Sequence, residues 1–457
     1  MTKFPESFLW GVSSSAHQVE GENAYNQWSD WERAGRIRDG STSGPACSFW
    51  EEPERDLELM QHLGLNAARI SIEWSRLEPQ EGRWDSSALG RYYRLLANMR
   101  RRGIRPFVTL HHFTHPKWFE DRGGFLAPDA VDVFSRYLYR TVEVLRHVCT
   151  DWVTVNEPNV FCAFGYLLGE FPPGWKGELS KALQCLTRMA RCHAAAYRII
   201  NGFQNNANVG WAQNYVVFEP GSSRARDRVL SGIFDSLFNQ SFFDLMRVGR
   251  LRPPWNRFCD TASEAQDKYD FVGLNVYSRL YVTADRSAHE SLFARISVPD
   301  HVPQGDPAAE YPYGECYPEA ITKAVEFASA DRKPIYILEN GVPDRDDRIR
   351  PWLLVQASKA LHGLLSRGHD VRGYFHWALT DNFEWSEGWR LRFGLYELDR
   401  ESQRRVPRYS AEVFRRIVLA NGIPDDLLDS DGECSPPLSS KIPPLLSRSI
   451  NTDFIAK

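Results

Sequence analysis

The chain lacks a charge excess and a long apolar run. Its 457 residues carry 55 lysines and arginines against 59 aspartates and glutamates, which gives a formal net charge of −4. Such a balance supplies neither a basic field for nucleic acid nor a polybasic patch for a membrane surface, so neither partner is expected. No run of about 18 apolar residues occurs, which argues against a transmembrane helix.

Other absences concern location, redox state and cofactors. The first residues contain no basic segment followed by an apolar one, so no Sec signal is expected and a cytoplasmic location is predicted. The eight cysteines form no CxxC pair, and they are expected to be reduced, buried thiols rather than disulfides or zinc ligands. No glycine-rich loop follows a predicted strand, which argues against a dinucleotide site.

What the sequence does contain is a regular alternation of strand and helix patterns. Eight short runs rich in Val, Ile and aromatic residues predict strands buried on both faces, as in a parallel sheet. The predicted strands span 8–15, 67–74, 105–112, 151–157, 208–214, 271–277, 335–339 and 371–379. Amphipathic patterns predict helices over 53–64, 86–103, 129–147, 180–201, 228–248, 317–330, 351–368 and 408–421.

Eight strand–helix units predict an α/β fold, a single (β/α)8 TIM barrel with functional residues at the C-terminal strand ends. A doubly wound open sheet is the alternative, and the missing glycine-rich loop counts against it. Long stretches at 22–50, 159–180 and 278–316 are expected to form loops over the barrel mouth. The barrel domain is assigned to 1–423, and 424–457 to a polar C-terminal extension that wraps the surface, mediates self-association or is partly disordered.

Two glutamates stand at the ends of predicted strands, Glu157 within 154–159 and Glu339 within 337–341. Burying a carboxylate is costly unless it has a function or a partner. At equivalent points of a barrel, two such groups can face each other across a sugar-sized gap, the arrangement of a glycosidase. Seven of the eight predicted strands supply a polar or aromatic residue to the same rim. These residues are Gln18, Arg69, Trp74, His111, His112, Asn156, Glu157, Asn275, Tyr277, Glu339 and Trp377.

The motifs of the chain resemble those of glycoside hydrolase family 1, the retaining β-glycosidases, over roughly residues 4–423. They are Phe8-Leu9-Trp10-Gly11, Gln18-Val19-Glu20-Gly21, Arg69-Ile70-Ser71-Ile72-Glu73-Trp74, Asn156-Glu157-Pro158, Glu339-Asn340-Gly341, Asp381-Asn382-Phe383-Glu384-Trp385 and Arg392-Phe393-Gly394-Leu395. The segments 156–159 and 171–174 look most like the archaeal-type, broad-specificity branch. The resemblance implies a retaining exo-β-glycosidase that removes terminal β-D-glucosyl, and also β-D-galactosyl or fucosyl, residues from small glycosides or oligosaccharides.

By that resemblance, Glu339 is the nucleophile and Glu157 the acid/base. Arg69 and Tyr277 match the positions that hold the nucleophile, and a cation and a phenol there would keep it ionised. Asn275 matches the residue that supports both carboxylates. No metal or organic cofactor is needed, because the two carboxylates carry out both proton transfer and covalent catalysis.

The resemblance also implies a set of residues that hold the sugar. They are Gln18, His112, Asn156, Trp377, Glu384 and Trp385. Asn156 is expected at the 2-hydroxyl, Trp377 under the ring, and Gln18 with Glu384 at the 3-, 4- and 6-hydroxyl region. Glu384 argues against a 6-phospho-β-glycosidase, because relatives of that kind carry Ser near this position and a carboxylate would repel phosphate.

Two other functions are the alternatives, a transglycosidase with the same catalytic residues and a sugar-binding protein without catalysis. A transglycosidase would pass the sugar to an alcohol or a second sugar, and a non-catalytic sugar-binding barrel would lack one of the carboxylates that are present here. Three neighbours of the site depart from the family pattern, with Leu338 for Thr, Phe113 for Trp and His376 for Tyr or Phe. These departures leave the reaction intact and the preference among glucose, galactose and fucose open, as is the oligomeric state.

Overall fold

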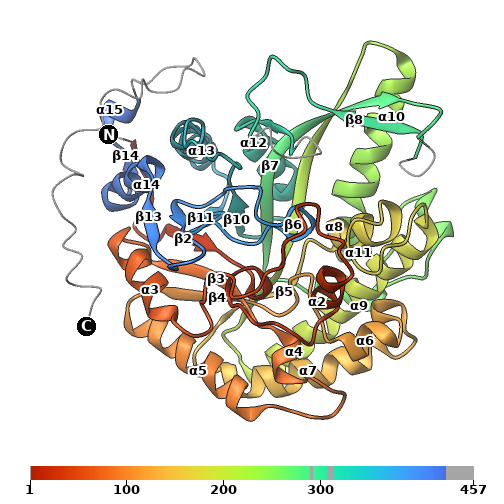
Figure 1. Cartoon of the computed structure of the whole chain (residues 1–457). Helices are drawn as coiled ribbons and strands as arrows, with labels where there is room; N and C mark the ends of the chain where they lie inside the picture. Colours follow the sequence, from red (N-terminus) through yellow and green to blue (C-terminus); the bar gives the residue numbers. More distant parts are fainter. Residues whose placement is uncertain (1, 289–291, 306–312, 429–457) are drawn as a thin grey trace.

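The computed structural model describes residues 2–288, 292–305 and 313–428, and its centre is a closed ring of eight parallel strands (Figure 1). The ring contains β2 (Leu9–Ser13), β3 (Ala67–Ser71), β4 (Arg105–Thr109), β5 (Asp151–Asn156), β6 (Asn208–Pro220), β7 (Phe271–Ala284), β10 (Ile335–Asn340) and β11 (Val371–His376). β11 pairs back onto β2 and closes the barrel. The predicted (β/α)8 barrel and its eight strands are confirmed.

Helices surround the ring and connect successive strands (Figure 1). They include α3 (Pro53–His62), α5 (Ser86–Arg101), α7 (Ala130–Leu145), α9 (Leu179–Phe203), α12 (Glu319–Ala328), α13 (Arg350–Ser366) and α14 (Tyr409–Ala420). The helix predicted over 228–248 is instead three segments: α10 (Ala225–Phe234), a π-helical turn (Asp235–Gln240) and α11 (Ser241–Val248). Short strands β1 (Thr2–Lys3) and β14 (Gly422–Ile423) pair antiparallel and bring the two ends of the domain together.

Local sequence explains where several of these helices begin and end. Pro53 occupies the first turn of α3, where its missing N–H costs nothing. The Asp85 carboxylate caps α5 by accepting hydrogen bonds from the amides of Ser87 and Ala88 at 2.8 and 3.0 Å. Gly249 follows α11 with φ of 68°, the left-handed conformation that commonly terminates a helix.

The interior of the barrel is filled by side chains, so it is a packed core and not a channel. Gly11 and Gly210 make room for it, because an added Cβ would lie 2.6 Å from the Phe375 ring or 2.5 Å from the Phe271 carbonyl oxygen. The buried residues that pack together here are Leu9, Ala67, Phe107, Val153, Ala212, Phe271, Tyr336, Leu338 and Phe375. This layer closes the barrel beneath the strand ends and gives the site above it a rigid floor.

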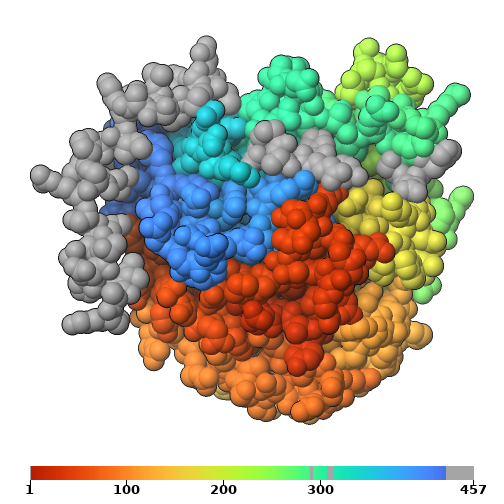
Figure 2. All heavy atoms as spheres, viewed as in Figure 1, coloured from red at the N-terminus to blue at the C-terminus, as the bar shows by residue number. Residues whose placement is uncertain are grey.

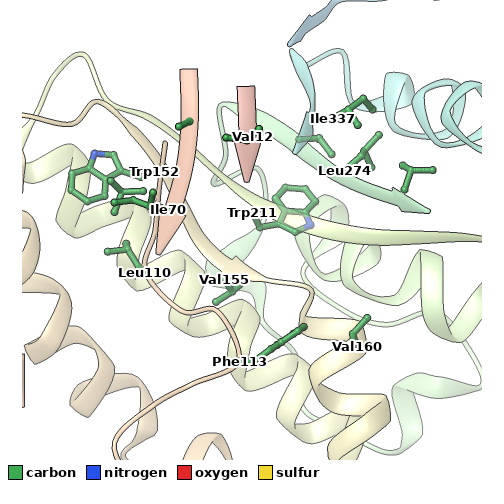
Figure 3. Close-up of a cluster of buried hydrophobic side chains, with 14 of the residues drawn as sticks. Val12, Ile70, Leu110, Phe113, Trp152, Val155, Val160, Trp211, Leu274 and Ile337 are labelled. Atoms are coloured by element: carbon green, nitrogen blue, oxygen red, sulfur yellow. The ribbon is translucent and has the colours of Figure 1, made fainter. Parts of the chain in front are cut away.

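Side chains that point away from the ring form a second, larger core against the helices. Figure 3 labels Trp152 and Trp211 in this layer, together with Ile70 and Leu274 from other strands. The Trp152 indole donates a hydrogen bond to Gln204 Oε1 at 2.9 Å, at the C-terminal end of α9. Alternation along each strand thus sends one set of side chains to the helices and leaves the other set to the barrel axis.

The stretches predicted as loops over the barrel mouth contain short elements of their own. Residues 22–50 include α2 (Gln27–Arg33), and 159–180 begins within α8 (Pro158–Cys162). Residues 278–316 continue β7 and add β8 (Ala294–Ser297) and β9 (Glu315–Cys316), both antiparallel to β7. Figure 2 shows the N-terminal (red) and C-terminal (blue) segments side by side on one face.

Two further expectations can be compared with the described residues. No helix in residues 2–288, 292–305 or 313–428 is long and apolar enough to cross a membrane. The cysteines in these ranges are buried, as predicted, except for the half-buried Cys259. Cys434 and most of the predicted extension 424–457 lie outside the described residues.

A buried ion pair secures the segment that leads from β11 to Glu384. Both guanidinium nitrogens of Arg408 donate to the Asp381 carboxylate at 2.8 Å, and the Gly394 amide adds a third donor at 3.0 Å. Because Arg408→Ala removes both short hydrogen bonds of the cation to a buried carboxylate and leaves it with the Arg392 guanidinium 3.8 Å away, we expect the free energy of unfolding to fall by about 3 kcal/mol. Urea denaturation followed by circular dichroism measures this change.

The matched control is Arg416→Ala, because Arg416 forms an ion pair with Asp426 that is largely exposed to solvent. Exposed pairs contribute about 0–1 kcal/mol, so this variant should unfold close to the wild-type midpoint. Equal destabilisation by the two substitutions would contradict a special role for the buried pair.

Candidate active site

Both predicted glutamates follow an irregularity in their strand. The register of β5 against β6 shifts between Val153 and Asn156, and that of β10 against β7 shifts between Ile337 and Glu339. Such bulges break the strict alternation of side chains and can re-aim a residue toward the axis. Glu157 has φ of 41° and ψ of 58°, a left-handed conformation that is uncommon for a residue with a Cβ.

Two asparagine side chains hold Glu157. Asn214 Nδ2 and Asn275 Nδ2 each donate to Glu157 Oε1 at 2.8 Å. Asn214 stands beside Asn275 in the β6–β7 ladder, and Asn275 stands beside Glu339 in the β7–β10 ladder. The two glutamates are therefore connected across adjacent strands through a pair of amides.

Glu339 is held by a cation and a phenol. The Arg69 guanidinium donates through Nη1 to Glu339 Oε1, and the Tyr277 hydroxyl donates to Glu339 Oε2 at 2.6 Å. Arg69 is itself fixed by Thr109 Oγ1 at 2.9 Å and by Asn156 Oδ1 at 2.6 Å. Because Arg69 is fully buried, its charge acts on Glu339 with little screening by solvent.

The environments of the two carboxyls push their protonation states apart. Burial, followed by the charge of Glu339, raises the pKa of Glu157 to about 8, against the opposing hydrogen bonds of Asn214 and Asn275. Burial also raises the pKa of Glu339, but Arg69 and Tyr277 oppose that rise by stabilising its ionised form. The pair is therefore arranged to keep the proton on Glu157 and the negative charge on Glu339 near neutral pH.

A second polar group lies around Glu384. The Trp377 indole donates to Glu384 Oε1 at 3.1 Å, and Gln18 Nε2 lies 3.4 Å from Glu384 Oε2. Gln18 Nε2 also donates to Asn382 Oδ1 at 2.9 Å and to the Phe383 carbonyl at 2.8 Å. Burial raises the pKa of Glu384 to about 8, so this carboxyl can act as either a donor or an acceptor near neutral pH.

His112 connects the two groups. Its Nε2 accepts a hydrogen bond from Asn156 Nδ2 at 3.0 Å, and its ring stacks at 6.0 Å from Trp377 and 6.1 Å from Trp385. Burial, followed by the charge of Arg69, holds the His112 pKa well below its usual range, so the ring is neutral. The proton then lies on Nδ1, a buried atom that has no hydrogen-bond partner among the described residues.

The structure thus brings the predicted catalytic and sugar-binding residues into one connected cluster. The acids, Arg69, Asn156, Asn275 and Tyr277 form one part, and Gln18, Glu384 and Trp377 the other, with His112 between them. Trp385 contacts His112, but its ring also packs on Trp28 at 4.8 Å and His17 at 5.7 Å, within the aromatic core.

Two of the predicted rim residues lie outside this cluster. Trp74 stacks on Tyr137 of α7 with centroids 4.7 Å apart, and His111 packs against Phe125 and Phe161.

Sequence analysis missed Asn214, which is a direct partner of Glu157. The signal was present, because Asn214 is the last residue of the one predicted strand for which no rim residue is named. Of the three departures from the family pattern, Phe113 contacts Trp385 at 5.2 Å. Leu338 lies in the barrel interior, and His376 faces Phe414 of α14.

No group of three or more His, Cys, Asp or Glu side chains in the described part of the chain is arranged to hold a metal ion. The polar groups of the site are instead two carboxyls with different proton affinities, surrounded by amide, phenol and indole donors. This arrangement can give a proton, offer an anionic nucleophile and bind several hydroxyl groups.

Known proteins resemble this chain along nearly its whole length. The family model described as glycosyl hydrolase family 1 matches residues 1–423. β-Glucosidase A of Thermotoga maritima is 30% identical over 452 residues, which cover 93% of this chain and 99% of that protein. A β-galactosidase of Pyrococcus woesei is 31% identical over 499 residues, with 92% and 98% covered.

Solved structures give the same result. A β-glycosidase from Pyrococcus horikoshii superimposes with a TM-score of 0.85 and 36% identity, covering 93% of this chain and 97% of that one. The Thermotoga maritima β-glucosidase in complex with deoxynojirimycin superimposes with a TM-score of 0.87 and 28% identity, covering 93% and 100%. The chain therefore belongs to glycosyl hydrolase family 1, as its motifs predicted.

Proposed function

We propose that the protein is a retaining exo-β-glycosidase in which Glu339 is the nucleophile and Glu157 the acid/base. The observation that carries this proposal is the position of Asn275 between the two carboxyls. Its amide donates to Glu157 Oε1 at 2.8 Å, and its backbone stands beside Glu339 in the β7–β10 ladder. The charge of Glu339 is one cause of the raised pKa of Glu157, which supports a short separation between the two carboxyls.

A short separation between the two carboxyls favours a retaining over an inverting reaction. Retaining enzymes place their carboxyls about 5–5.5 Å apart so that one attacks the anomeric carbon directly. Inverting enzymes need about 6.5–9.5 Å, because a water molecule must fit between one carboxylate and the sugar. The place of Asn275, bonded to Glu157 and paired with Glu339 along the neighbouring strand, supports the shorter distance.

The mechanism follows from the different environments of the two acids. Glu339 attacks the anomeric carbon while Glu157 donates its proton to the leaving oxygen, which gives a covalent glycosyl-enzyme and a free alcohol. Esterification removes the charge of Glu339, one of the causes that raise the pKa of Glu157. Glu157 then becomes a stronger acid, remains ionised and can accept a proton from the incoming water. Water attack releases the sugar and restores Glu339.

The polar residues beyond the acids support a sugar as the substrate. Glu384, Gln18 and the unpartnered Nδ1 of His112 offer hydrogen bonds to hydroxyl groups. Trp377 adds an apolar ring, and the charge of an ionised Glu384 would disfavour a phosphate. Because relatives carry the names β-glucosidase and β-galactosidase, we propose terminal β-glucosyl residues, and also β-galactosyl or fucosyl residues, of small glycosides and oligosaccharides.

The extent of the catalytic domain and the location of the protein complete the proposal. We propose that the catalytic domain spans residues 1–423, the range of the family match, with 424–457 as an extension. A cytoplasmic location is retained from the sequence analysis, and self-association stays open.

The anomeric configuration of the first product tests the proposal. With an aryl β-glucoside in deuterated buffer, proton NMR during the first minutes should record β-glucose before mutarotation produces the α-anomer, because two inversions give net retention. Omitting the enzyme provides the baseline, and authentic α- and β-glucose calibrate the signals. Initial release of α-glucose would contradict the double displacement, and the absence of any hydrolysis of β-glycosides would contradict the function itself.

A further inference from the structure

Tyr313 is an aromatic residue next to the candidate site that sequence analysis did not single out. Its ring lies edge-on to Tyr277, with centroids 5.7 Å apart, and 5.0 Å from the Phe393 ring. Tyr277 is the residue whose hydroxyl donates to Glu339. Tyr313 therefore packs directly against a residue that contacts the proposed nucleophile.

The chain around Tyr313 is fastened to β7, the strand that carries Tyr277. Gly314 has φ of 113°, and an added Cβ would lie 2.2 Å from Ser278 Cβ, so only glycine permits this close passage. In the next strand, Glu315 accepts two hydrogen bonds of 2.7 Å from the Arg279 guanidinium. A bidentate ion pair of this kind fixes orientation as well as distance. Gly314 and Glu315, which follow Tyr313 in the chain, thus fix its backbone beside β7.

The Tyr313 hydroxyl is free to bind a ligand. The side chain is half-buried, and no group in residues 2–288, 292–305 or 313–428 forms a hydrogen bond with its hydroxyl. Burial, followed by the charges of Glu384, Glu157 and Glu339, raises the Tyr313 pKa well above its usual value. The phenol is therefore a neutral donor that lies close enough to all three carboxyls to sense their charges.

We propose that Tyr313 contacts the bound sugar and donates a hydrogen bond to a hydroxyl group at its Glu384 end, on C4 or C6. The ring contacts with Tyr277 and Phe393 hold the phenol in one cluster with Trp377, whose indole donates to Glu384. Within the described residues its hydroxyl has no hydrogen-bond partner to leave. This inference rests on the proposed function, since it takes the sugar to lie between Glu384 and the two acids. Tyr313 is then a specificity-determining residue and not a structural ring alone.

The test compares wild type and Tyr313→Phe on an aryl β-glucoside and on its 2-, 3-, 4- and 6-deoxy analogues. Removing one hydrogen bond to the substrate should lower kcat/KM on the parent glucoside about tenfold. On the 4-deoxy or the 6-deoxy analogue, whichever lacks the contacted hydroxyl, the two enzymes should have equal kcat/KM. If the ring acts only by packing against Tyr277, Tyr313→Phe should change kcat/KM by the same factor on the parent glucoside and on every deoxy analogue.

Tyr281→Phe is the matched control. The Tyr281 hydroxyl on β7 donates to Glu315 on β9 at 3.0 Å, so this variant also loses one tyrosine hydroxyl near Tyr313, but not one proposed to contact the sugar. The control should retain wild-type kcat/KM on every analogue. No loss in Tyr313→Phe, an equal loss on all analogues, or a loss abolished only by the 2- or 3-deoxy change would each overturn the inference. Hydrolysis of the parent glucoside by wild type tests the proposed function separately, because it does not depend on Tyr313.

Discussion

Glu339→Ala is expected to lower kcat on aryl β-glucosides by on the order of 10⁶-fold, the scale on which deletion of a covalent nucleophile acts in another enzyme. The substitution removes the proposed nucleophile, while Arg69 and Tyr277 would face an empty space. Stopped assays at high enzyme concentration measure the residual rate. Glu143→Ala on the exposed face of α7 is the control, and its rate should equal that of wild type.

Added azide should restore activity to the Glu339→Ala variant. A small anion can occupy the vacated space, attack from the face that Glu339 used and leave an α-glycosyl azide, the product of a single inversion. NMR of the isolated product identifies its configuration. Rescue at a different carboxyl, with none at position 339, would show that another residue is the nucleophile.

Glu157→Gln should have an effect that depends on the leaving group. Without a proton donor, kcat/KM should fall by about 10²–10⁴-fold for an alkyl β-glucoside. A dinitrophenyl β-glucoside needs no such proton, so its first step should remain fast and a burst of phenol should precede slow turnover, because the base for water is also missing. Rapid-quench measurements separate the two phases. Equal losses on both substrates would contradict the role of Glu157 as the acid.

The pH dependence provides an independent measure of the same residue. Glu157, as the proposed acid, can act only while it is protonated, and its pKa is raised to about 8. Wild-type kcat/KM should therefore be sustained below that pH and decline as pH rises through about 8. Glu157→Gln cannot lose a proton there, so the limb should be strongly reduced, and any decline that is left belongs to Glu384, whose pKa is also raised to about 8. A limb that persists unchanged in the variant would assign it to another group.

Much of the fold could be predicted because the same local signal is repeated around the ring. Each barrel strand is a short run of β-branched and aromatic residues bounded by a helix with a recognisable start or stop, as Pro53 and Gly249 illustrate. Polar residues that end such runs, such as Asn156 and Asn275, converge in the structure because parallel strands end on one rim. Family motifs then supplied the expected roles, which strand patterns alone could not.

The rest depends on contacts that no local pattern encodes. The register shifts before Glu157 and Glu339 arise from pairing with neighbouring strands, so strict alternation along the sequence cannot locate them. Tyr313 reaches the site because β9 pairs with an extension of β7 beyond the barrel. The segment 228–248 has a helical pattern of apolar residues throughout, and this periodicity does not indicate the π-helical turn at Asp235–Gln240.

The order of the strands divides the reaction between two halves of the chain. The segment that ends with β5 carries Arg69 and leads directly into Glu157, whereas the segment from β6 onward carries Asn275, Tyr277 and Glu339. A proteolytic cut that let these halves separate would leave one fragment with the proposed proton donor and the other with the proposed nucleophile. Turnover of a glycoside therefore reports that the whole ring is intact, and it should disappear in the same transition in which the ring opens.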